Sequence, residues 1–242
     1  MKELNIESDN KKEFKFVPFG DIHLGAKNCD TELVHKYLDK VKKEKAHILL
    51  MGDLIENASR ISVGTEVYKQ TLNPTEQVKK ITEWFKHHNI MASQRGNHEL
   101  RAWAVLGIDI GEIIANNLDT FYVPNMGLYH MSVGKQKYDA FAWHPRKNAS
   151  TTPARINIIK KQAEWIPQAE LFMLGHMHDL YHTTELRRID GEFKPVHYVL
   201  TGSFLNWDDG YAEELGLRPT KLGAPLITLS GKEHAIKVDL EW

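Results

Sequence analysis

Short apolar runs alternate with amphipathic stretches along most of the chain. The run at residues 48–51 (ILLM) has the length and composition of a buried strand. Apolar residues at helical spacing predict a helix that starts at an N-cap on Thr31. The same reasoning predicts strands at 13–19, 89–94, 120–124, 127–133, 137–143, 170–174, 181–188, 193–201, 225–230 and 235–240, and further helices at 75–88, 100–117 and 153–165.

The order of these elements changes halfway along the chain. The first half alternates strands with helices, whereas the second half contains hairpins with turns at 134–135 and 190–191. This order predicts an α/β fold in which two packed sheets are flanked by helices, a two-sheet sandwich. We expect residues 13–242 to form a single domain and the charged residues 1–12 to be a polar, frayed lead-in.

The composition bears on the cellular compartment and the partners of such a domain. The 242 residues carry a formal net charge of −1 and a single cysteine, Cys29, which excludes an internal disulfide and suits a reducing compartment. The polar first residues hold no apolar signal core, and the apolar runs are far shorter than a membrane span. These features predict a cytoplasmic location and no membrane partner. The near-neutral net charge gives the protein no overall positive potential that would attract nucleic acid, but it is compatible with a local basic patch.

Polar groups with metal-binding chemistry follow five of the predicted strands. Gly52 lets the backbone turn after residues 48–51, and Asp53 follows at the carboxyl end of that strand, where open α/β sheets bind ligands. Carboxylate, imidazole and amide groups bind divalent metals of intermediate softness. One histidine after one strand is as readily a turn residue, but five such strand ends together favour a metal centre. The side chains are Asp21, His23, Asp53, Asn97, His98, His144, His176 and His178.

The motifs that carry these residues occur in the order GDIH, GD, GNHE, H and GHMH. This order resembles the calcineurin-like metallophosphoesterase superfamily over residues 20–179, about two-thirds of the chain. The resemblance implies an α/β/β/α sandwich that holds two metal ions bridged by Asp53, with His98 facing the substrate. It assigns Asp21, His23, Asp53 and His178 to one metal, and Asp53, Asn97, His144 and His176 to the other.

A centre of this kind would hydrolyse phosphoesters through a hydroxide shared by the two cations, because each cation lowers the pKa of bound water. The expected catalytic residues are Asp53, which bridges the metals, and His98, which would protonate the leaving oxygen or stabilise the transition state. Arg95 or Arg146 would bind the substrate by neutralising charge on the phosphate oxygens.

Departures from the superfamily's patterns bear on the substrate. Its protein phosphatases carry GDxxDRG, where the arginine grips phosphate, but Glu56 and Asn57 stand here in place of the second Asp and the Arg. This argues against a protein-phosphatase activity. Glu99 and Asp179, each beside an expected ligand, would orient imidazoles from behind or would be solvated loop carboxylates.

The leading hypothesis is a two-metal phosphodiesterase acting on nucleic acid or nucleotides. Manganese is the expected metal because magnesium prefers all-oxygen sites, and iron, zinc or nickel would suit the same ligands. A phosphomonoesterase or a nucleotide pyrophosphate hydrolase is the second hypothesis. The third is a catalytically silent scaffold that reuses the fold for protein contacts.

The loops around the motifs decide which phosphoester would fit. A groove lined by Arg60, Arg146 and Trp207 would favour a polymer such as DNA or RNA, through phosphate contacts and base stacking, whereas a capped pocket would favour a small phosphoester. The alternative interpretation places Trp103 in the core and residues 160–161 on a solvated helix face. The sequence leaves the oligomeric state open.

Overall fold

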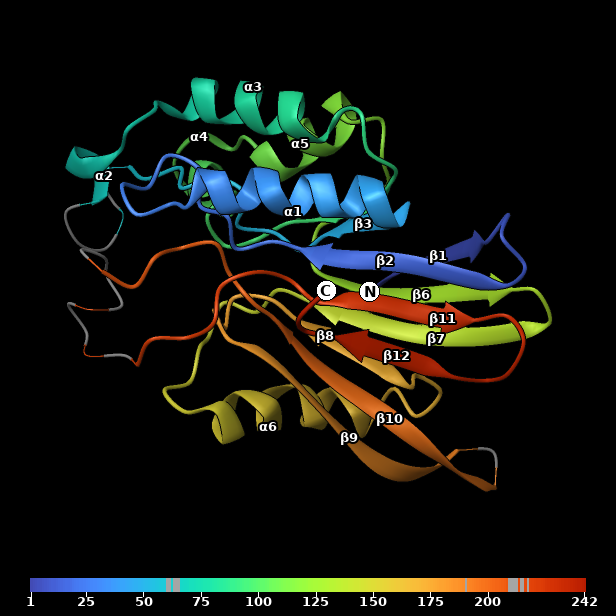
Figure 1. The fold of residues 1–242 in the computed structure, drawn as a ribbon. Coiled ribbons are helices and arrows are strands. Elements are labelled where there is room, and N and C mark those ends of the chain that lie inside the picture. The colour runs from blue at the N-terminus through green and yellow to red at the C-terminus, as the bar shows by residue number, and fades with distance from the viewer. Residues whose placement is uncertain (60–61, 63–65, 190, 209–212, 214–215, 217) are drawn as a thin grey trace.

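The computed structural model describes residues 1–242 except 60–61, 63–65, 190, 209–212, 214–215 and 217. Two six-stranded sheets stack face to face, with helices on both outer sides (Figure 1). The predicted α/β sandwich is therefore confirmed. The strands are β1 Lys2–Glu7, β2 Glu13–Phe19, β3 His47–Leu50, β4 Ile90–Gln94, β5 Tyr122–Val123, β6 Met126–Val133, β7 Gln136–Trp143, β8 Leu171–Leu174, β9 Leu180–Ile189, β10 Glu192–Thr201, β11 Leu226–Ser230 and β12 Ile236–Asp239.

Both sheets mix parallel and antiparallel pairs. One has the strand order β12-β11-β2-β3-β4-β5, in which β2, β3, β4 and β5 run parallel. The other has the order β1-β6-β7-β8-β10-β9, in which β7, β8 and β10 run parallel. Parallel neighbours bring their carboxyl ends to one edge, so the loops after β2, β3 and β4 lie together, and so do those after β7 and β8.

Three apolar clusters separate the layers. Phe16, Met51 and Tyr129 belong to the cluster between the two sheets, where both facing surfaces are buried. Helices α1 Thr31–Glu44, α3 Pro74–Phe85 and α5 Ile110–Asn117 cover the β2–β3–β4 sheet, and α6 Thr152–Ala163 covers the other, as Figure 1 shows. Burying an amphipathic face on each side of each sheet produces four layers.

Local capping chemistry sets where the helices begin. The cap of α1 is Asp30 rather than Thr31, because the Asp30 side chain accepts the amide of Leu33. At α3, the Asn73 side chain accepts the amide of Glu76 and the Glu76 side chain accepts the amide of Asn73, a reciprocal capping box on either side of Pro74.

One predicted helix is two helices in the structure. Residues 100–117 form α4 Leu100–Leu106 and α5 Ile110–Asn117, and the break falls at Gly107, which has a φ of +67°. Glycine adopts this left-handed conformation without steric cost, and Asp109 then caps α5 by accepting the amide of Glu112. A short helix, α2 Glu66–Lys69, was not predicted from the sequence.

Residues 2–7 were expected to be a frayed lead-in, and that prediction was wrong. They form β1, which pairs in parallel with β6 at the edge of its sheet. Leu4 and Ile6 alternate with polar residues and pack against the cluster between the sheets. Two apolar side chains in six residues were too weak a pattern to recognise, but they suffice when β6 supplies a hydrogen-bonding edge.

Phe204, in the loop after β10, ties the core to the first motif. Its ring is fully buried and stacks on Phe19 with centroids 4.6 Å apart, while its amide donates to the carbonyl oxygen of Asp21. The side chain therefore supports the segment in which the expected metal ligands begin.

Replacing Phe204 with alanine should lower the free energy of unfolding by about 3–5 kcal/mol, because it leaves a cavity in a close-packed core. Phe193→Ala is the matched control, since Phe193 is 74% exposed and should change stability by less than about 0.5 kcal/mol. Urea unfolding followed by circular dichroism measures both, and equal stabilities of the two variants would contradict the assignment of Phe204 to the core.

Candidate metal centre

The five strand ends predicted to carry metal-binding groups meet at one place. Asp21 and His23 follow β2, Asp53 follows β3, and the remaining groups follow β4, β7 and β8. Five of these residues have a left-handed backbone: Asp21 (φ 50°), His23 (52°), Asp53 (48°), His176 (68°) and His178 (49°). Such φ values are costly for residues other than glycine and cluster at functional sites. The turns thus hold these side chains in orientations that an ordinary strand end would not produce.

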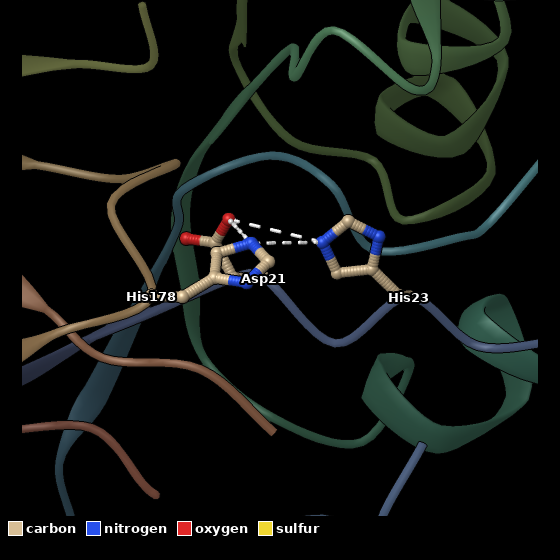
Figure 2. A group of neighbouring side chains, drawn as sticks. All are labelled: Asp21, His23 and His178. Atoms are coloured by element: carbon tan, nitrogen blue, oxygen red, sulfur yellow. Dashed lines mark hydrogen bonds and ion pairs between the residues drawn. The ribbon is translucent and has the colours of Figure 1, made fainter. Parts of the chain in front are cut away.

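One group of side chains consists of Asp21, His23 and His178 (Figure 2). Nε2 of His178 lies 3.2 Å from Oδ1 of Asp21 and 3.2 Å from Nε2 of His23. Two imidazole nitrogens at this distance repel each other unless a proton or a cation lies between them. A carboxylate oxygen and two such nitrogens could hold one divalent metal ion.

The second group consists of Asp53, His144 and His176, with Asn97 beside it. Nε2 of His144 lies 3.2 Å from Oδ2 of Asp53 and 3.1 Å from Oδ1 of Asn97. On the other side of its ring, Nδ1 of His144 donates to the carbonyl oxygen of Met51 at 2.7 Å, which leaves Nε2 as the ligand nitrogen. These residues could hold a second ion.

Asp53 connects the two groups. Its Oδ2 lies 3.2 Å from His144 Nε2 and 3.8 Å from a ring nitrogen of His23, of His98 and of His176. This oxygen is fully buried, yet it forms no hydrogen bond with any described residue, and the same is true of His176 Nδ1. Unpaired buried polar atoms are rare and costly. Their convergence fits a cation bound at this point.

The electrostatics of the centre also favour positive charge. Although burial disfavours a charged imidazole, the carboxylates of Asp53 and Asp21 raise the pKa of His144 to about 10. Burial and the neighbouring His98 lower the pKa of His23 to about 4, so this ring is neutral, as a metal ligand must be. The buried carboxylates therefore attract a proton where no metal supplies the charge.

Glu56 lies at the centre of a third group, which the sequence analysis did not identify. Its Oε2 is 3.2 Å from His23 Nδ1 and 3.4 Å from His98 Nδ1, and its Oε1 accepts from Arg101 at 2.8 Å. Nδ1 of His98 also donates to the Glu56 carbonyl at 2.9 Å. Because these atoms satisfy one another, this group orients His23 and His98 rather than holding a metal. The sequence signal was only that a glutamate replaced the second aspartate of the GDxxD pattern.

Glu99 and Asp179 are buried, and neither contacts an imidazole among the described hydrogen bonds. Glu99 instead accepts the backbone amides of Asp53 (3.0 Å), Leu54 (2.7 Å) and Gly96 (2.9 Å). The carboxylate of Asp179 lies 2.6 Å from the Thr152 hydroxyl and 3.2 Å from Nη1 of Arg155. The prediction that they orient histidines, or are solvated, is therefore replaced by a role in holding backbone and arginine side chains.

The residues expected to contact substrate are less tightly grouped. Arg95 donates to Asp109 at 2.6 Å, and Arg146 is exposed in the loop after His144. Trp103 is 55% exposed, so its interpretation as a core residue was wrong. Arg60 lies outside the described residues.

Solved structures with a similar fold include three of related architecture. A Staphylococcus aureus protein described as a candidate 5′-nucleotidase, in complex with alpha-ketoglutarate, matches with a TM-score of 0.50 and 10% identity, over 94% of this chain. The match spans only about half, 53%, of that protein. An uncharacterised Streptococcus pneumoniae TIGR4 protein described as a predicted phosphoesterase (TM-score 0.39, 11% identity) is covered over 97% of its length and 93% of this chain. Vps29 from Entamoeba histolytica, complexed with zinc (TM-score 0.38, 12% identity), has the same coverage of 97% and 93%.

No protein-family model and no curated protein matches the sequence. The Staphylococcus aureus structure shares the two-sheet α/β sandwich that the order of elements predicted for this chain. At 10% identity the likeness extends to the fold alone. Among the described residues, no helix combines the length and hydropathy needed to cross a bilayer.

Divalent metal should stabilise the protein. At a free Mn²⁺ concentration of 100 times Kd, binding to the native state contributes about 2.7 kcal/mol, which corresponds to a rise in Tm of about 5–10 °C for a chain of this size. Differential scanning fluorimetry with and without Mn²⁺ measures the shift. The variant Asp53→Asn should lose most of it, and an undiminished shift in that variant would contradict the placement of the ion at Asp53.

Proposed function

We propose that the protein is a two-metal phosphodiesterase that acts on nucleic acid or nucleotides. The observation that carries the proposal is Oδ2 of Asp53, which is buried, forms no hydrogen bond with a described residue and has four imidazoles within 4 Å. Asp21, His23, Asp53 and His178 would hold one ion, and Asp53, Asn97, His144 and His176 the other. Manganese is the ion we propose, because the ligands mix oxygen with imidazole nitrogen.

The bound ions would supply Lewis-acid polarisation of the phosphate and a nucleophile derived from water. The chain's own residues orient the groups around them. Asp53 presents Oδ2 to the centre while its Oδ1 accepts the backbone amide of His98 at 2.8 Å, so the bridging carboxylate and His98 are fixed relative to each other.

His98 is the residue we propose to protonate the leaving oxygen. Its Nδ1 is held by the Glu56 carbonyl, and its Nε2 is turned toward the centre, 3.8 Å from Asp53 Oδ2. Despite burial, the charges of Asp53 and Glu56 raise the pKa of His98 to about 9. Acidic neighbours that favour the charged form of the ring suit His98 to act as a general acid.

A cavity near Asp179 would hold the part of the substrate beyond its phosphate, although no candidate metal ligand lines it. It has a volume of about 400 Å³ and is lined by residues that include Thr152, Lys160, Tyr181 and Arg218. Thr152, which lines the cavity, contacts Asp179, the residue after His178, so the cavity lies on the side of the last motif. Cationic and aromatic groups together suit a nucleotide, whose phosphate and base they would contact.

The Mn²⁺-loaded protein should hydrolyse bis-p-nitrophenyl phosphate, and Asp53→Asn should lower kcat/KM by more than about 100-fold. Loss of a residue that merely orients a ligand costs about 10–100-fold, so loss of the shared ligand should cost more. Asp139→Asn is the matched control, because that carboxylate bonds His130 on the β6–β7 hairpin, and its activity should match wild type. A fully active Asp53→Asn variant would exclude the bridging role.

Comparison of ester classes separates the two enzymatic hypotheses. If the protein is a diesterase, kcat/KM for bis-p-nitrophenyl phosphate should exceed that for p-nitrophenyl phosphate by about 10-fold or more, since Asn57 stands where phosphatases place the arginine that grips a monoester. Steady-state rates with the same Mn²⁺-loaded preparation measure the ratio. A larger value for the monoester would favour the phosphomonoesterase.

A further inference from the structure

Arg101 is the arginine that lies against His98. It is the second residue of α4 and comes one turn after His98 in the chain. Its Nη2 is 3.0 Å from Nε2 of His98, and its Nη1 donates to both the carbonyl and the Oε1 of Glu56, each at 2.8 Å. Only 19% of the side chain is exposed. The guanidinium is therefore held in one orientation by an ion pair.

The hydrogen bonds of His98 show which of its two ring nitrogens lies against Arg101. Nδ1 of His98 lies 2.9 Å from the Glu56 carbonyl, which can only accept, so Nδ1 carries the proton of that bond. Nε2 is left on the side of Arg101, and it is also the nitrogen that lies 3.8 Å from Asp53 Oδ2. Arg101 thus borders the nitrogen of His98 that faces the candidate metal centre.

The other arginines expected to bind phosphate are placed differently. Arg95 is engaged with Asp109, which also accepts the hydroxyl of Tyr122 at 2.7 Å. Asn57, at the position of the phosphatase arginine, donates its side-chain amide to the carbonyl of His98 at 2.8 Å. Asn57 therefore holds the backbone of His98 and supplies no guanidinium. Arg101 places a guanidinium beside the same histidine from α4.

We propose that Arg101 binds a non-bridging oxygen of the substrate phosphate beside His98. This inference rests on the proposed phosphoesterase function, and it adds Arg101 to Arg95 and Arg146, whose substrate-binding roles stay predictions. Glu56 fixes one edge of the guanidinium, and Nη2, which lies beside His98, would form a charge-assisted hydrogen bond with the phosphate. The positive charge that contacts the substrate would thereby come from α4, the helix that follows the GNHE motif.

Phosphate binding tests the proposal separately from catalysis. Inorganic phosphate is titrated into the Mn²⁺-loaded protein by isothermal calorimetry, and metal content and Tm are measured on each preparation. Arg101→Ala should weaken phosphate binding by about 10-fold or more, because a charge-assisted contact is lost. Arg101→Lys keeps a positive charge beside Glu56 and protects the fold, and its affinity should fall between those of Arg101→Ala and wild type, because lysine lacks the fork.

Arg188→Ala is the matched control. Arg188 is exposed near the end of β9, where it donates to the carbonyl of Gly191, and its loss should leave phosphate affinity unchanged. If both Arg101 variants bind metal and phosphate as wild type does while wild type cleaves the diester, the inference is overturned and the proposed function stands. If wild type binds phosphate through Arg101 but cleaves no ester, the proposed function fails and the inference stands. A metal-loaded wild type that binds no phosphate overturns the inference.

Discussion

The loops after β3 and β4 hold each other through two buried carboxylates, and the rest of the centre depends on that exchange. Glu99 accepts the amides of Asp53 and Gly96, while Asp53 Oδ1 accepts the amide of His98. Each loop thus supplies the acceptor that the other loop's backbone needs. Burial and the nearby charge of Asp53 raise the pKa of Glu99, but the backbone amides around it favour its charged form. Loss of Glu99 would leave buried amides unpaired on both loops, and loss of the Asp53 carboxylate would leave the amide of His98 unpaired.

This exchange explains how the site sustains a strained backbone. A left-handed residue other than glycine costs on the order of 1–3 kcal/mol unless its surroundings over-determine it. The backbone amide of Asp53, a residue with a φ of 48°, is held by Glu99. The carboxylate of Asp21 is held by one amide of the last motif, that of His176, at 2.9 Å. The hydrogen bonds that fix these carboxylates come from loops far away in the sequence. The centre is consequently a property of the assembled sandwich rather than of any single loop.

How much of this could be predicted depends on the range of the interaction concerned. Strand ends such as Gly52-Asp53 could be predicted because apolar runs and glycines are local signals. The order of the motifs indicated a fold that the structure confirms. The break at Gly107 was missed because the apolar spacing continues across it, and β1 was missed because its partner β6 is remote in sequence. The position of Glu56 between two histidines could not be predicted, since it depends on how three loops pack. For the same reason the ligand roles assigned from the motifs remain proposals even though their side chains converge.

Helix α4 differs from the elements that carry the other site residues. The strands that lead to Asp53 and His144 lie inside their sheets, with hydrogen-bonded neighbours on both sides, whereas α4 has no fully buried residue. Elements with so few buried contacts open locally at a lower free-energy cost than the strands of a core. Changes along α4 can therefore accumulate with little effect on the stability of the sheets. The sequence of α4 can therefore change independently of the strands that position the candidate metal ligands. Related chains could keep those strands while replacing the helix that carries Arg101.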